Sequence, residues 1–263
     1  MTASDAAPVV AIAGVRKTYP TGREALAPVD LTVGRGEFLT LLGPSGCGKT
    51  TLLNLMAGLI EPSAGMLRWW GDDFDATGSA GRRLAMVFQA PTLMPWARID
   101  ANVRLPLDLA GAPRIDADRE VARALDLVGL SDTGAQLPRE LSGGMQMRAS
   151  IARALVTGPD LLLMDEPFGA LDEFTRQRLD VELLALWAAR KLTVVFVTHS
   201  IVEAVFLSTR VVVMAARPGR IVAAVPIDEP YPRGDAFRLK PAFSEQCQRL
   251  SRLVADAATG VAP

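Results

Sequence analysis

The segment that decides the fold is FLTLLGPSGCGKTTLLNLM, residues 38–56. It begins with an apolar run of strand length and continues into a glycine-rich loop. Leu52, Leu53, Met56 and Leu59 then follow at near i, i+3 and i+4 spacing, which is typical of one helix face. The segment therefore predicts a buried strand at 38–43, a loop, and a helix that carries Leu59 on its apolar side.

The loop GPSGCGKT, residues 43–50, has the chemistry of a phosphate-binding loop. Gly43, Gly48, Lys49 and Thr50 satisfy the pattern G-x-x-x-x-G-K-[ST]. The glycines let backbone N–H groups converge on phosphate oxygens, and the following helix adds its N-terminal dipole. Lys49 is placed to reach the β- and γ-phosphates and Thr50 to offer a hydroxyl to Mg²⁺. A nucleoside triphosphate is the natural ligand.

A second apolar run, LLLM at 161–164, is directly followed by two residues with carboxylate side chains. Asp165 comes at the end of the predicted strand, where it can hold the hydration shell of Mg²⁺, and Glu166 beside it can polarise an attacking water. By themselves these two residues are also compatible with an ordinary start of a helix or turn. Together with Lys49 they favour nucleotide hydrolysis.

The rest of the chain alternates between strand and helix patterns. Strands with one exposed face are predicted at 9–15 and 25–33, and helices without strong strand runs at 91–138. Buried strands and helices then alternate up to Ser200, which favours a mostly parallel sheet covered on both faces. A hairpin at 210–225 and a C-terminal helix near 243–255 complete the pattern.

The composition indicates a folded domain whose anion site is built locally. The chain has 263 residues, 49% of them hydrophobic, and its 28 basic and 29 acidic residues leave a formal net charge of −1. Cys47 and Cys247 form no metal-like pair, which favours a reducing compartment. Neither a leader pattern nor an apolar run of ~18 residues is present. We expect a chain that is soluble by itself and reaches any membrane through partner chains.

The segment LSGGMQMR, residues 141–148, contains a second candidate anion site. Ser142, Gly143 and Gly144 open a predicted helix, as the first loop does. In isolation, this pattern also fits a simple helix cap. If the two sites cannot reach one nucleotide within one chain, the second serves a nucleotide held by another copy, and the assembly is a two-fold dimer with two ATPs.

These motifs resemble those of the ATP-binding subunits of ATP-binding-cassette (ABC) transporters. GPSGCGKT resembles the Walker A loop, LLLMDEPFGALD the Walker B strand with a D-loop that runs to Asp172, and LSGGMQMR the family signature. VFQAPTLMPW resembles the Q-loop, and VRKTYP the segment whose aromatic residue stacks on adenine. The motifs follow one another in the family's order from about residue 9 to residue 225.

The resemblance implies a fold and a domain plan. The fold is an α/β P-loop ATPase domain with an N-terminal antiparallel β subdomain and an inserted helical subdomain. One domain would span 1–263, with the helical subdomain at about 91–158 and a C-terminal extension at 226–263.

The resemblance also implies a role for each matching residue. Tyr19 would stack on the base, Glu166 would act as general base, and Asp172 would link the two halves of a dimer. Ser142 and Gly144 would bind the γ-phosphate across that dimer. The implied catalytic residues are Lys49, Gln89, Glu166 and His199, and those implied for Mg²⁺ are Thr50, Gln89 and Asp165. The implied ATP-binding residues are Tyr19, Gly43, Pro44, Ser45, Gly46, Cys47, Gly48, Lys49, Thr50, Thr51, Ser142, Gly143, Gly144 and Asp172.

His199, in VVFVTHS, is the only histidine of the chain. A lone histidine after an apolar strand is usually a packed core residue. By resemblance it is instead the histidine that contacts the γ-phosphate and helps to position the water and Glu166.

Further features resemble importers of the nitrate, sulfonate and taurine group. These are the methionine directly after SGG, the segment PFGALD, the PW pair after the Q-loop, and RPGRI at 217–221. Met147 departs from the group, where glutamine is usual, and we expect the difference to affect the helix surface only. The implied partners are a second copy, two integral membrane permease subunits and a solute-binding protein, at the cytoplasmic face of the inner membrane. The ATPase subunit does not bind the cargo, so the solute stays unnamed.

Two other functions are compatible with a phosphate-binding loop. A soluble ABC ATPase that acts on DNA or ribosomes usually has long insertions, zinc motifs or two cassettes, none of which the sequence contains. A GTPase or small-molecule kinase would leave the SGG helix unexplained, and no N-K-x-D guanine motif is present. A low aromatic content of 6% with no basic stripe also argues against a nucleic-acid partner.

Overall fold

The computed structural model describes residues 7–71, 82–169 and 171–259. Ala170, inside the predicted D-loop, and the outer ends of the predicted 1–263 domain lie outside the described residues.

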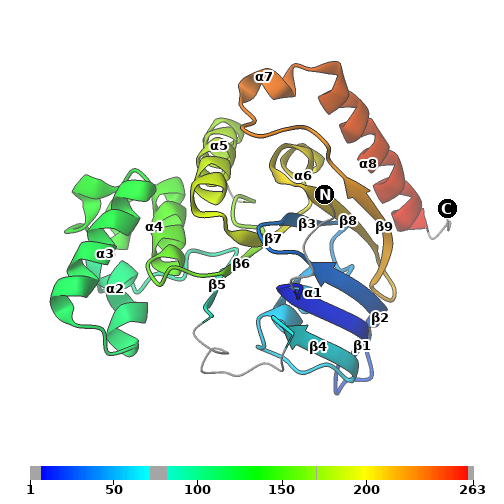
Figure 1. Ribbon diagram of the computed structural model, residues 1–263, viewed down its shortest axis with the longest axis horizontal. Coiled ribbons are helices and arrows are strands. Elements are labelled where there is room, and N and C mark those ends of the chain that lie inside the picture. Colours follow the sequence, from blue (N-terminus) through cyan, green and yellow to red (C-terminus); the bar gives the residue numbers. More distant parts are fainter. Residues whose placement is uncertain (1–6, 72–81, 170, 260–263) are drawn as a thin grey trace.

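A six-stranded sheet forms the centre of the molecule (Figure 1). Its order is β5-β6-β7-β3-β8-β9, and every neighbouring pair is parallel except β8 and β9. β3 and β7 are buried along their whole length, and β6 is buried up to its last residue, because both faces of the sheet are covered. The predicted parallel sheet is confirmed. The strands are β3 (Phe38–Leu42), β5 (Leu84–Val87), β6 (Leu161–Asp165), β7 (Thr193–Thr198), β8 (Arg210–Ala215) and β9 (Arg220–Pro226).

A separate antiparallel sheet has the order β2-β1-β4 and comprises β1 (Val10–Thr18), β2 (Glu24–Val33) and β4 (Ala64–Trp69). Alternate residues of β1 and β2 face the core, as the sequence pattern predicts. Trp69 is 6% exposed and its Nε1 donates to the backbone oxygen of Met56 over 2.8 Å, whereas Trp70, directly after β4, is only partly buried against the same core. One tryptophan therefore anchors this sheet to the helix beneath it.

Helix α1 (Lys49–Met56) lies between the two sheets and shares their core. Its leucines pack against one face of the central sheet, which includes Leu41 of β3 and Val195 of β7. The predicted continuation of the helix through Leu59 is wrong: the helix ends at Met56 and the Leu59 side chain is 58% exposed. Gly58 adopts φ +67° and turns the chain away, which is how many helices end.

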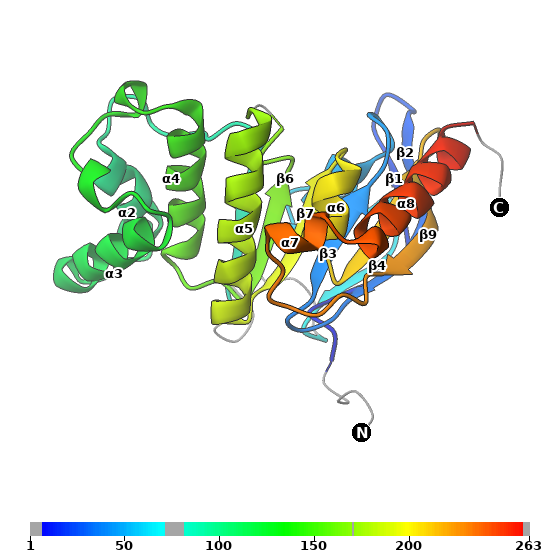
Figure 2. The ribbon, with the colours of Figure 1, turned by 90° about the horizontal axis from the view of Figure 1, so that it is seen from above.

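The opposite face of the central sheet is covered by a row of helices (Figure 2). These are α5 (Glu173–Arg190), α6 (Ile201–Leu207) and α8 (Pro241–Thr259), with the short α7 (Asp235–Arg238) between the last two. Phe38 and Phe196 point to this face, where Phe38 meets the ring of Trp187 edge-on with centroids 6.0 Å apart. The alternation of side chains along β3 and β7 thus supplies one core on each face.

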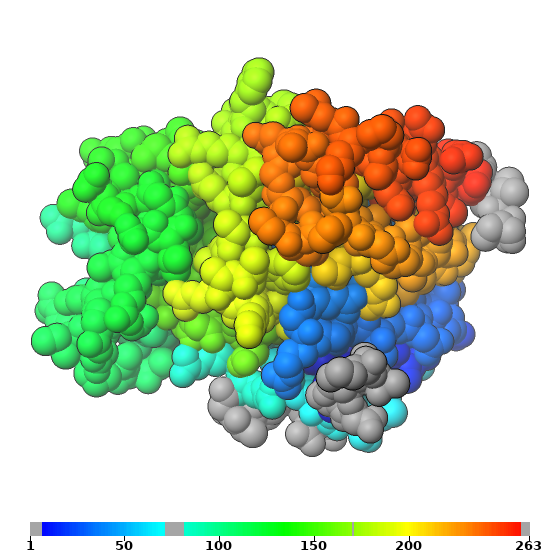
Figure 3. Space-filling model, turned by 45° about the horizontal axis from the view of Figure 1, so that its top comes forward, coloured from blue at the N-terminus to red at the C-terminus, as the bar shows by residue number. Residues whose placement is uncertain are grey.

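Helices α2 (Ile99–Leu109), α3 (Arg114–Leu127) and α4 (Gly143–Leu155) pack on one another beside the β5 edge (Figure 1). In the space-filling view they form a lobe of their own (Figure 3). Two 3-10 turns, Ser131–Thr133 and Pro138–Glu140, connect α3 to α4. The boundaries 91–158 and 226–263 stay predictions.

Helix α4 also corrects one expectation. Met147 is 3% exposed and belongs to the hydrophobic core, so its departure from the usual glutamine does not alter the helix surface. Separately, none of the helices in the described ranges is both long enough and apolar enough to cross a membrane.

Candidate nucleotide-binding site

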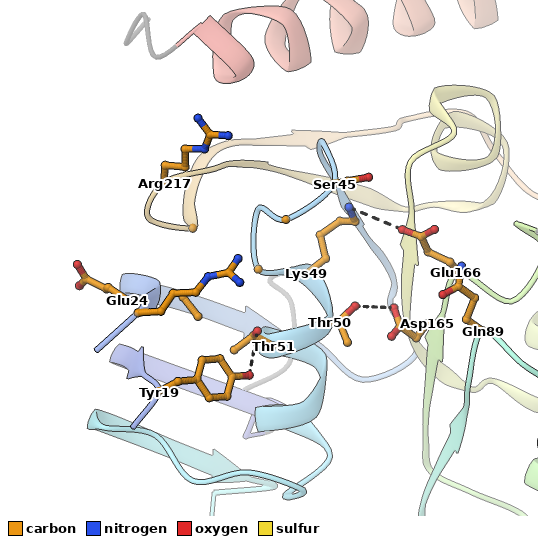
Figure 4. A pocket seen from close by; sticks show the side chains of 15 residues that line it. Tyr19, Glu24, Ser45, Lys49, Thr50, Thr51, Gln89, Asp165, Glu166 and Arg217 are labelled. Carbon is orange, nitrogen blue, oxygen red and sulfur yellow. Dashed lines mark hydrogen bonds and ion pairs between the residues drawn. The ribbon is translucent and has the colours of Figure 1, made fainter. Parts of the chain in front are cut away.

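The candidate site is a cavity of about 480 Å³ beside the carboxyl ends of β3 and β6 (Figure 4). In a parallel sheet these ends lie at one edge, where α/β proteins bind their ligands. The three-stranded sheet forms the opposite wall. The lining residues are Tyr19, Arg23, Glu24, Ala25, Ser45, Gly46, Gly48, Lys49, Thr50, Thr51, Gln89, Asp165, Glu166, Arg217 and Gly219.

The phosphate loop is held by contacts that exclude larger residues. A Cβ atom at Gly43 would lie 2.4 Å from the backbone oxygen of Met214 and 2.9 Å from Cys47 Sγ. Gly48 has φ +91°, a conformation that residues with side chains rarely adopt, and it is the residue from which α1 starts. The Cys47 side chain is buried and does not line the cavity, and burial raises the pKa of its thiol. Backbone packing therefore fixes the shape of the loop.

Lys49 is placed by the first turn of α1. Its side chain is 5% exposed, and Nζ donates to the backbone oxygen of Gly43 over 2.8 Å and to that of Pro44 over 3.2 Å. The same Nζ lies 3.8 Å from Glu166 Oε1. The lysine thus spans the loop and brings a positive charge to the carboxylate that follows β6.

Thr50 and Asp165 meet at the floor of the cavity. Thr50 Oγ1 donates to Asp165 Oδ1 over 3.1 Å. Burial raises the pKa of Asp165, while the hydrogen bond from Thr50 and the charge of Lys49 oppose that rise. A hydroxyl beside a partly desolvated carboxylate is a hard oxygen pair of the kind that Mg²⁺ prefers. These two residues therefore fit the metal that the sequence predicts, and Gln89 lines the same cavity.

Glu166 and His199 come from adjacent strands. Glu166 directly follows β6 and His199 directly follows β7, and these strands are hydrogen-bonded neighbours. His199 Nδ1 lies 3.0 Å from Glu166 Oε2. Glu166 adopts φ +44°, and its backbone N–H donates to the oxygen of Val197 over 3.0 Å. A glutamate in a strained conformation, held between Lys49 and His199, has the placement of a functional group.

His199 is not a packed core residue, because 58% of its side chain is exposed. Taken alone, a single histidine after an apolar strand predicts a packed core residue, and the structure contradicts that interpretation. The imidazole is not among the residues that line the cavity, but it contacts Glu166, which does line it.

Tyr19 lines the opposite side of the cavity. Its hydroxyl lies 3.4 Å from Thr51 Oγ1, and Lys17 Nζ lies 5.5 Å from the centre of its ring. Figure 4 shows the ring on the wall formed by the three-stranded sheet, away from Asp165 and Glu166. A nucleotide with its phosphates on the loop can therefore direct its base toward Tyr19.

Several lining residues were not predicted as part of the site. Arg23 directly precedes β2 and Glu24 begins it, while Arg217 and Gly219 belong to the turn between β8 and β9. This turn reaches the site because Gly219 exchanges backbone hydrogen bonds with the start of β2. The motif RPGRI was visible in the sequence, but the contact between two segments so far apart along the chain was not.

The predicted residues of the second anion site and Asp172 lie outside the cavity. Ser142 is the N-cap of α4 and accepts a hydrogen bond from the backbone N–H of Met145 over 3.3 Å; both Ser142 and Gly143 are exposed, and Gly144 is half-buried. Asp172 caps α5 and accepts from Thr175 Oγ1 over 2.7 Å, which lowers the pKa of its carboxyl. Ser45, Gly46 and Thr51 line the cavity, whereas Gly43 and Pro44 are not among its lining residues and present their backbone oxygens to Lys49 Nζ. One chain thus keeps its second candidate anion site apart from the first.

Comparison with known proteins decides the family. A family model described as ABC transporter matches residues 26–169, which contain the phosphate loop, the signature segment, Asp165 and Glu166. This chain belongs to the ABC transporter family. It is an ABC ATPase, as the order of its motifs predicts.

Relatives of this ABC ATPase include import proteins. It is 44% identical over 241 residues to the taurine import ATP-binding protein of Chromobacterium violaceum, covering 90% of this chain and 91% of that protein. It is 42% identical over 225 residues to the aliphatic sulfonates import ATP-binding protein of Bacillus licheniformis, covering 86% and 85%.

The fold of this ABC ATPase is also found in solved structures. A dimeric ATP-binding cassette in a post-hydrolysis state, bound to ADP and Pi, matches with a TM-score of 0.73 at 31% identity, covering 84% of this chain and 100% of that one. The predicted fold class is confirmed. The alternative of an ABC ATPase that acts on DNA or ribosomes is not favoured by these relatives.

Proposed function

We propose that this chain is the ATP-hydrolysing subunit of an importer for a small solute, of the nitrate, sulfonate, taurine or related type. The observation that carries the proposal is the convergence of Lys49, Asp165 and Glu166 on one cavity, with His199 in contact with Glu166 at its edge. The import function of the relatives named for taurine and aliphatic sulfonates supports the solute class.

In this proposal the phosphates of ATP lie on residues 43–51 and the adenine ring lies against Tyr19. Lys49 releases the backbone oxygens it now contacts and donates to the terminal phosphates. Thr50, Gln89 and Asp165 hold Mg²⁺, which supplies charge neutralisation on the phosphate oxygens. All three residues line the same cavity as the loop.

Glu166 is the proposed base. It accepts a proton from a water molecule at its Oε2 side, where His199 Nδ1 lies 3.0 Å away and fixes the carboxylate orientation. In this proposal His199 contacts the γ-phosphate, which the 58% exposure of its side chain permits. The positive charge of Lys49 Nζ, 3.8 Å from Glu166 Oε1, stabilises the carboxylate at its other oxygen.

The second half of each site comes from a second copy in the proposed assembly. Ser142 and Gly144 lie at an exposed helix N-terminus outside their own chain's cavity, so their backbone and hydroxyl donors are available to a γ-phosphate held by the partner copy. Asp172 would lie at the junction of the two copies. The dimeric arrangement of a solved relative supports this proposal.

The proposed membrane partners meet the segment after Gln89. Trp96 in this segment is 78% exposed, and Phe88 before it is 40% exposed. Large apolar side chains at the surface often mark a protein contact. We place two integral membrane permease subunits there, with a solute-binding protein in the same complex and this chain at the cytoplasmic face of the inner membrane.

Glu166→Gln tests the chemistry. The variant keeps the size of the side chain but removes the base, so it is expected to retain ATP binding, to lose ATP turnover by at least about a hundredfold, and to accumulate as an ATP-bound dimer. Turnover is measured by phosphate release and the dimer by size-exclusion chromatography with light scattering.

Glu61→Gln provides the matched control because Glu61 lies outside the cavity lining. Near-normal turnover in Glu166→Gln would overturn the assigned base. The importer itself is tested by purifying a tagged copy from membranes: recovery with integral membrane subunits is expected, and recovery with ribosomes or DNA alone would contradict the proposal.

A further inference from the structure

A buried carboxylate, Glu203 of α6, is hydrogen-bonded to the segment that carries His199. Glu203 is 4% exposed and its Oε2 accepts a hydrogen bond from Thr198 Oγ1. The backbone N–H of Ser200 donates to the same Thr198 hydroxyl over 2.9 Å. Thr198 and Ser200 are the residues on either side of His199, so Glu203 holds both flanks of the loop that presents the imidazole.

Arg176 of α5 connects Glu203 to the loop that contains Asp172. Its Nη2 donates to the backbone oxygen of Leu171 over 2.9 Å, and its Nε lies 3.5 Å from Glu203 Oε1. Leu171 is the residue before Asp172. One guanidinium therefore contacts both the segment before α5 and the carboxylate that holds the His199 loop.

A second buried pair extends the cluster to the C-terminal segment. Asp180, one turn beyond Arg176 on α5, is 1% exposed and accepts from Arg238 Nη2 of α7 over 2.8 Å. The Arg238 guanidinium lies 3.9 Å from the centre of the Phe206 ring on α6. Two acids and two guanidinium groups thus join α5, α6 and α7 in one cluster.

This cluster is a costly way to stabilise the packing of three helices. Removing charges from water carries a large desolvation penalty, and apolar residues of similar volume often stabilise a core as well or better. Arg176 Nε and two nitrogens of Arg238 also lack a hydrogen-bond partner within the described part of the chain. The arrangement is therefore better explained by a need for fixed geometry than by a need for stability.

We propose that Arg176 and Glu203 are positioning residues that couple the His199 loop to the Asp172 loop. The inference rests on the proposed function, in which His199 serves the chain's own ATP and Asp172 lies at the dimer junction. The Thr198–Glu203–Arg176–Leu171 path then links the state of one ATP site to the contact between copies. Breaking the path lowers turnover and the cooperativity between the two sites, but leaves ATP affinity nearly unchanged.

The decisive variant is Arg176→Met combined with Glu203→Gln, which removes both charges and leaves neither partner of this ion pair buried alone. We expect kcat for ATP hydrolysis to fall by about tenfold or more, KM for ATP to change by less than about twofold, and the Hill coefficient to fall toward one. Arg178→Met is the control: Arg178 is on the same helix, is exposed, and pairs only with Glu182 among the described residues.

A spectroscopic readout separates positioning from general stability. Because His199 is the only histidine, a sample labelled with histidine that carries ¹³C at Cε1 alone gives one ring signal. The ring signal in the presence of a non-hydrolysable ATP analogue is expected to shift in the double variant and to stay unchanged in Arg178→Met. Arg176→Lys retains the positive charge and cannot contact Leu171 and Glu203 together, so it is expected to lower kcat while it folds normally.

The outcomes distinguish this inference from the proposed function. If Glu166→Gln abolishes turnover while the double variant and Arg176→Lys keep wild-type kcat, Hill coefficient and His199 signal, the coupling is overturned and the ATPase assignment stands. If Glu166→Gln retains turnover, the proposed role of Glu166 as the base fails, which is a different result from loss of the coupling. Loss of kcat with an unshifted His199 signal would also contradict the positioning role.

Discussion

Tyr19 illustrates how much of the site depends on single side chains. Its ring is the aromatic surface on the wall of the three-stranded sheet, and its hydroxyl makes a long contact of 3.4 Å to Thr51. Aromatic stacking on a nucleobase contributes about 1–3 kcal/mol. The ring, not the hydroxyl, is therefore expected to supply the binding energy.

Tyr19→Ala is accordingly expected to raise KM for ATP by about five- to a hundredfold with a smaller effect on kcat, because stacking contributes to binding of the ground state. Tyr19→Phe is the matched control and should keep KM within about twofold. The measurement is steady-state phosphate release over a range of ATP concentrations. Equal losses in the two variants would assign the effect to the hydroxyl and contradict the stacking role.

The sequence predicted those site residues that belong to short, contiguous motifs. Lys49, Thr50, Asp165 and Glu166 belong to short motifs at the ends of predicted strands, and the structure brings them together. Arg217 was not predicted, because its position at the cavity follows from the contact of one turn with a distant strand. The placement of Ser142 outside the cavity agrees with the prediction that it serves a second copy. That assignment stays a prediction.

At the scale of elements, the phosphate loop is a rigid connection between β3 and α1. Its start packs directly against β8, since a Cβ atom added at Gly43 would lie 2.4 Å from the backbone oxygen of Met214. Backbone atoms of a buried strand cannot move aside easily, so an added methyl must displace the loop. Gly46, in contrast, faces open space, and only its φ of +77° disfavours a side chain.

Gly43→Ala is therefore expected to destabilise the protein by several kcal/mol and to weaken ATP binding strongly, because the loop is displaced from β8. Gly46→Ala should cost about 1 kcal/mol, the usual penalty for a non-glycine residue in this conformation. Both are measured by urea unfolding and by titration with a fluorescent ATP analogue. If the Gly43→Ala protein were as stable as Gly46→Ala, β8 would have to move to make room for the added methyl group, and the predicted displacement of the loop would be wrong.

Most helices and strands were predictable because their sequence patterns are strong, as in β3, β6 and β7. The end of α1 was not, because a leucine at helical spacing suggested continuation while Gly58 adopted a left-handed conformation. The order β5-β6-β7-β3-β8-β9 could not be derived from the motifs alone. Strand order depends on contacts between segments far apart in the sequence.

At the scale of the whole molecule, Asp180 makes stability depend on pH. Burial, with a contribution from Glu203, raises the pKa of Asp180 to about 7 against the opposing effect of Arg238. In the unfolded chain the ordinary value is 3.8. Between these two values the folded state binds more protons than the unfolded state, so the free energy of unfolding falls as pH rises from about 4 to about 7.

Asp180→Asn is uncharged at every pH and is expected to remove this contribution. Relative to the unaltered protein, the variant should gain stability as pH rises through that range, by at most about 4 kcal/mol at about 1.4 kcal/mol per pH unit. The measurement is urea unfolding across that pH range. Asp116→Asn is the control, because the Asp116 side chain on α3 is exposed. A stability difference that is constant with pH would contradict the buried titration.

The cavity has a further consequence because its two walls belong to different sheets. Tyr19 follows β1 and Glu24 begins β2 of the three-stranded sheet, whereas Asp165 ends β6 of the central sheet. Within the described residues, a backbone bridge between Leu26 and Gly219 joins the two sheets directly. A bound nucleotide therefore adds a non-covalent cross-link between the two sheets to this backbone bridge. Its binding free energy adds to the work needed to separate them, and amide hydrogen exchange in β1 and β2 should slow as nucleotide concentration rises.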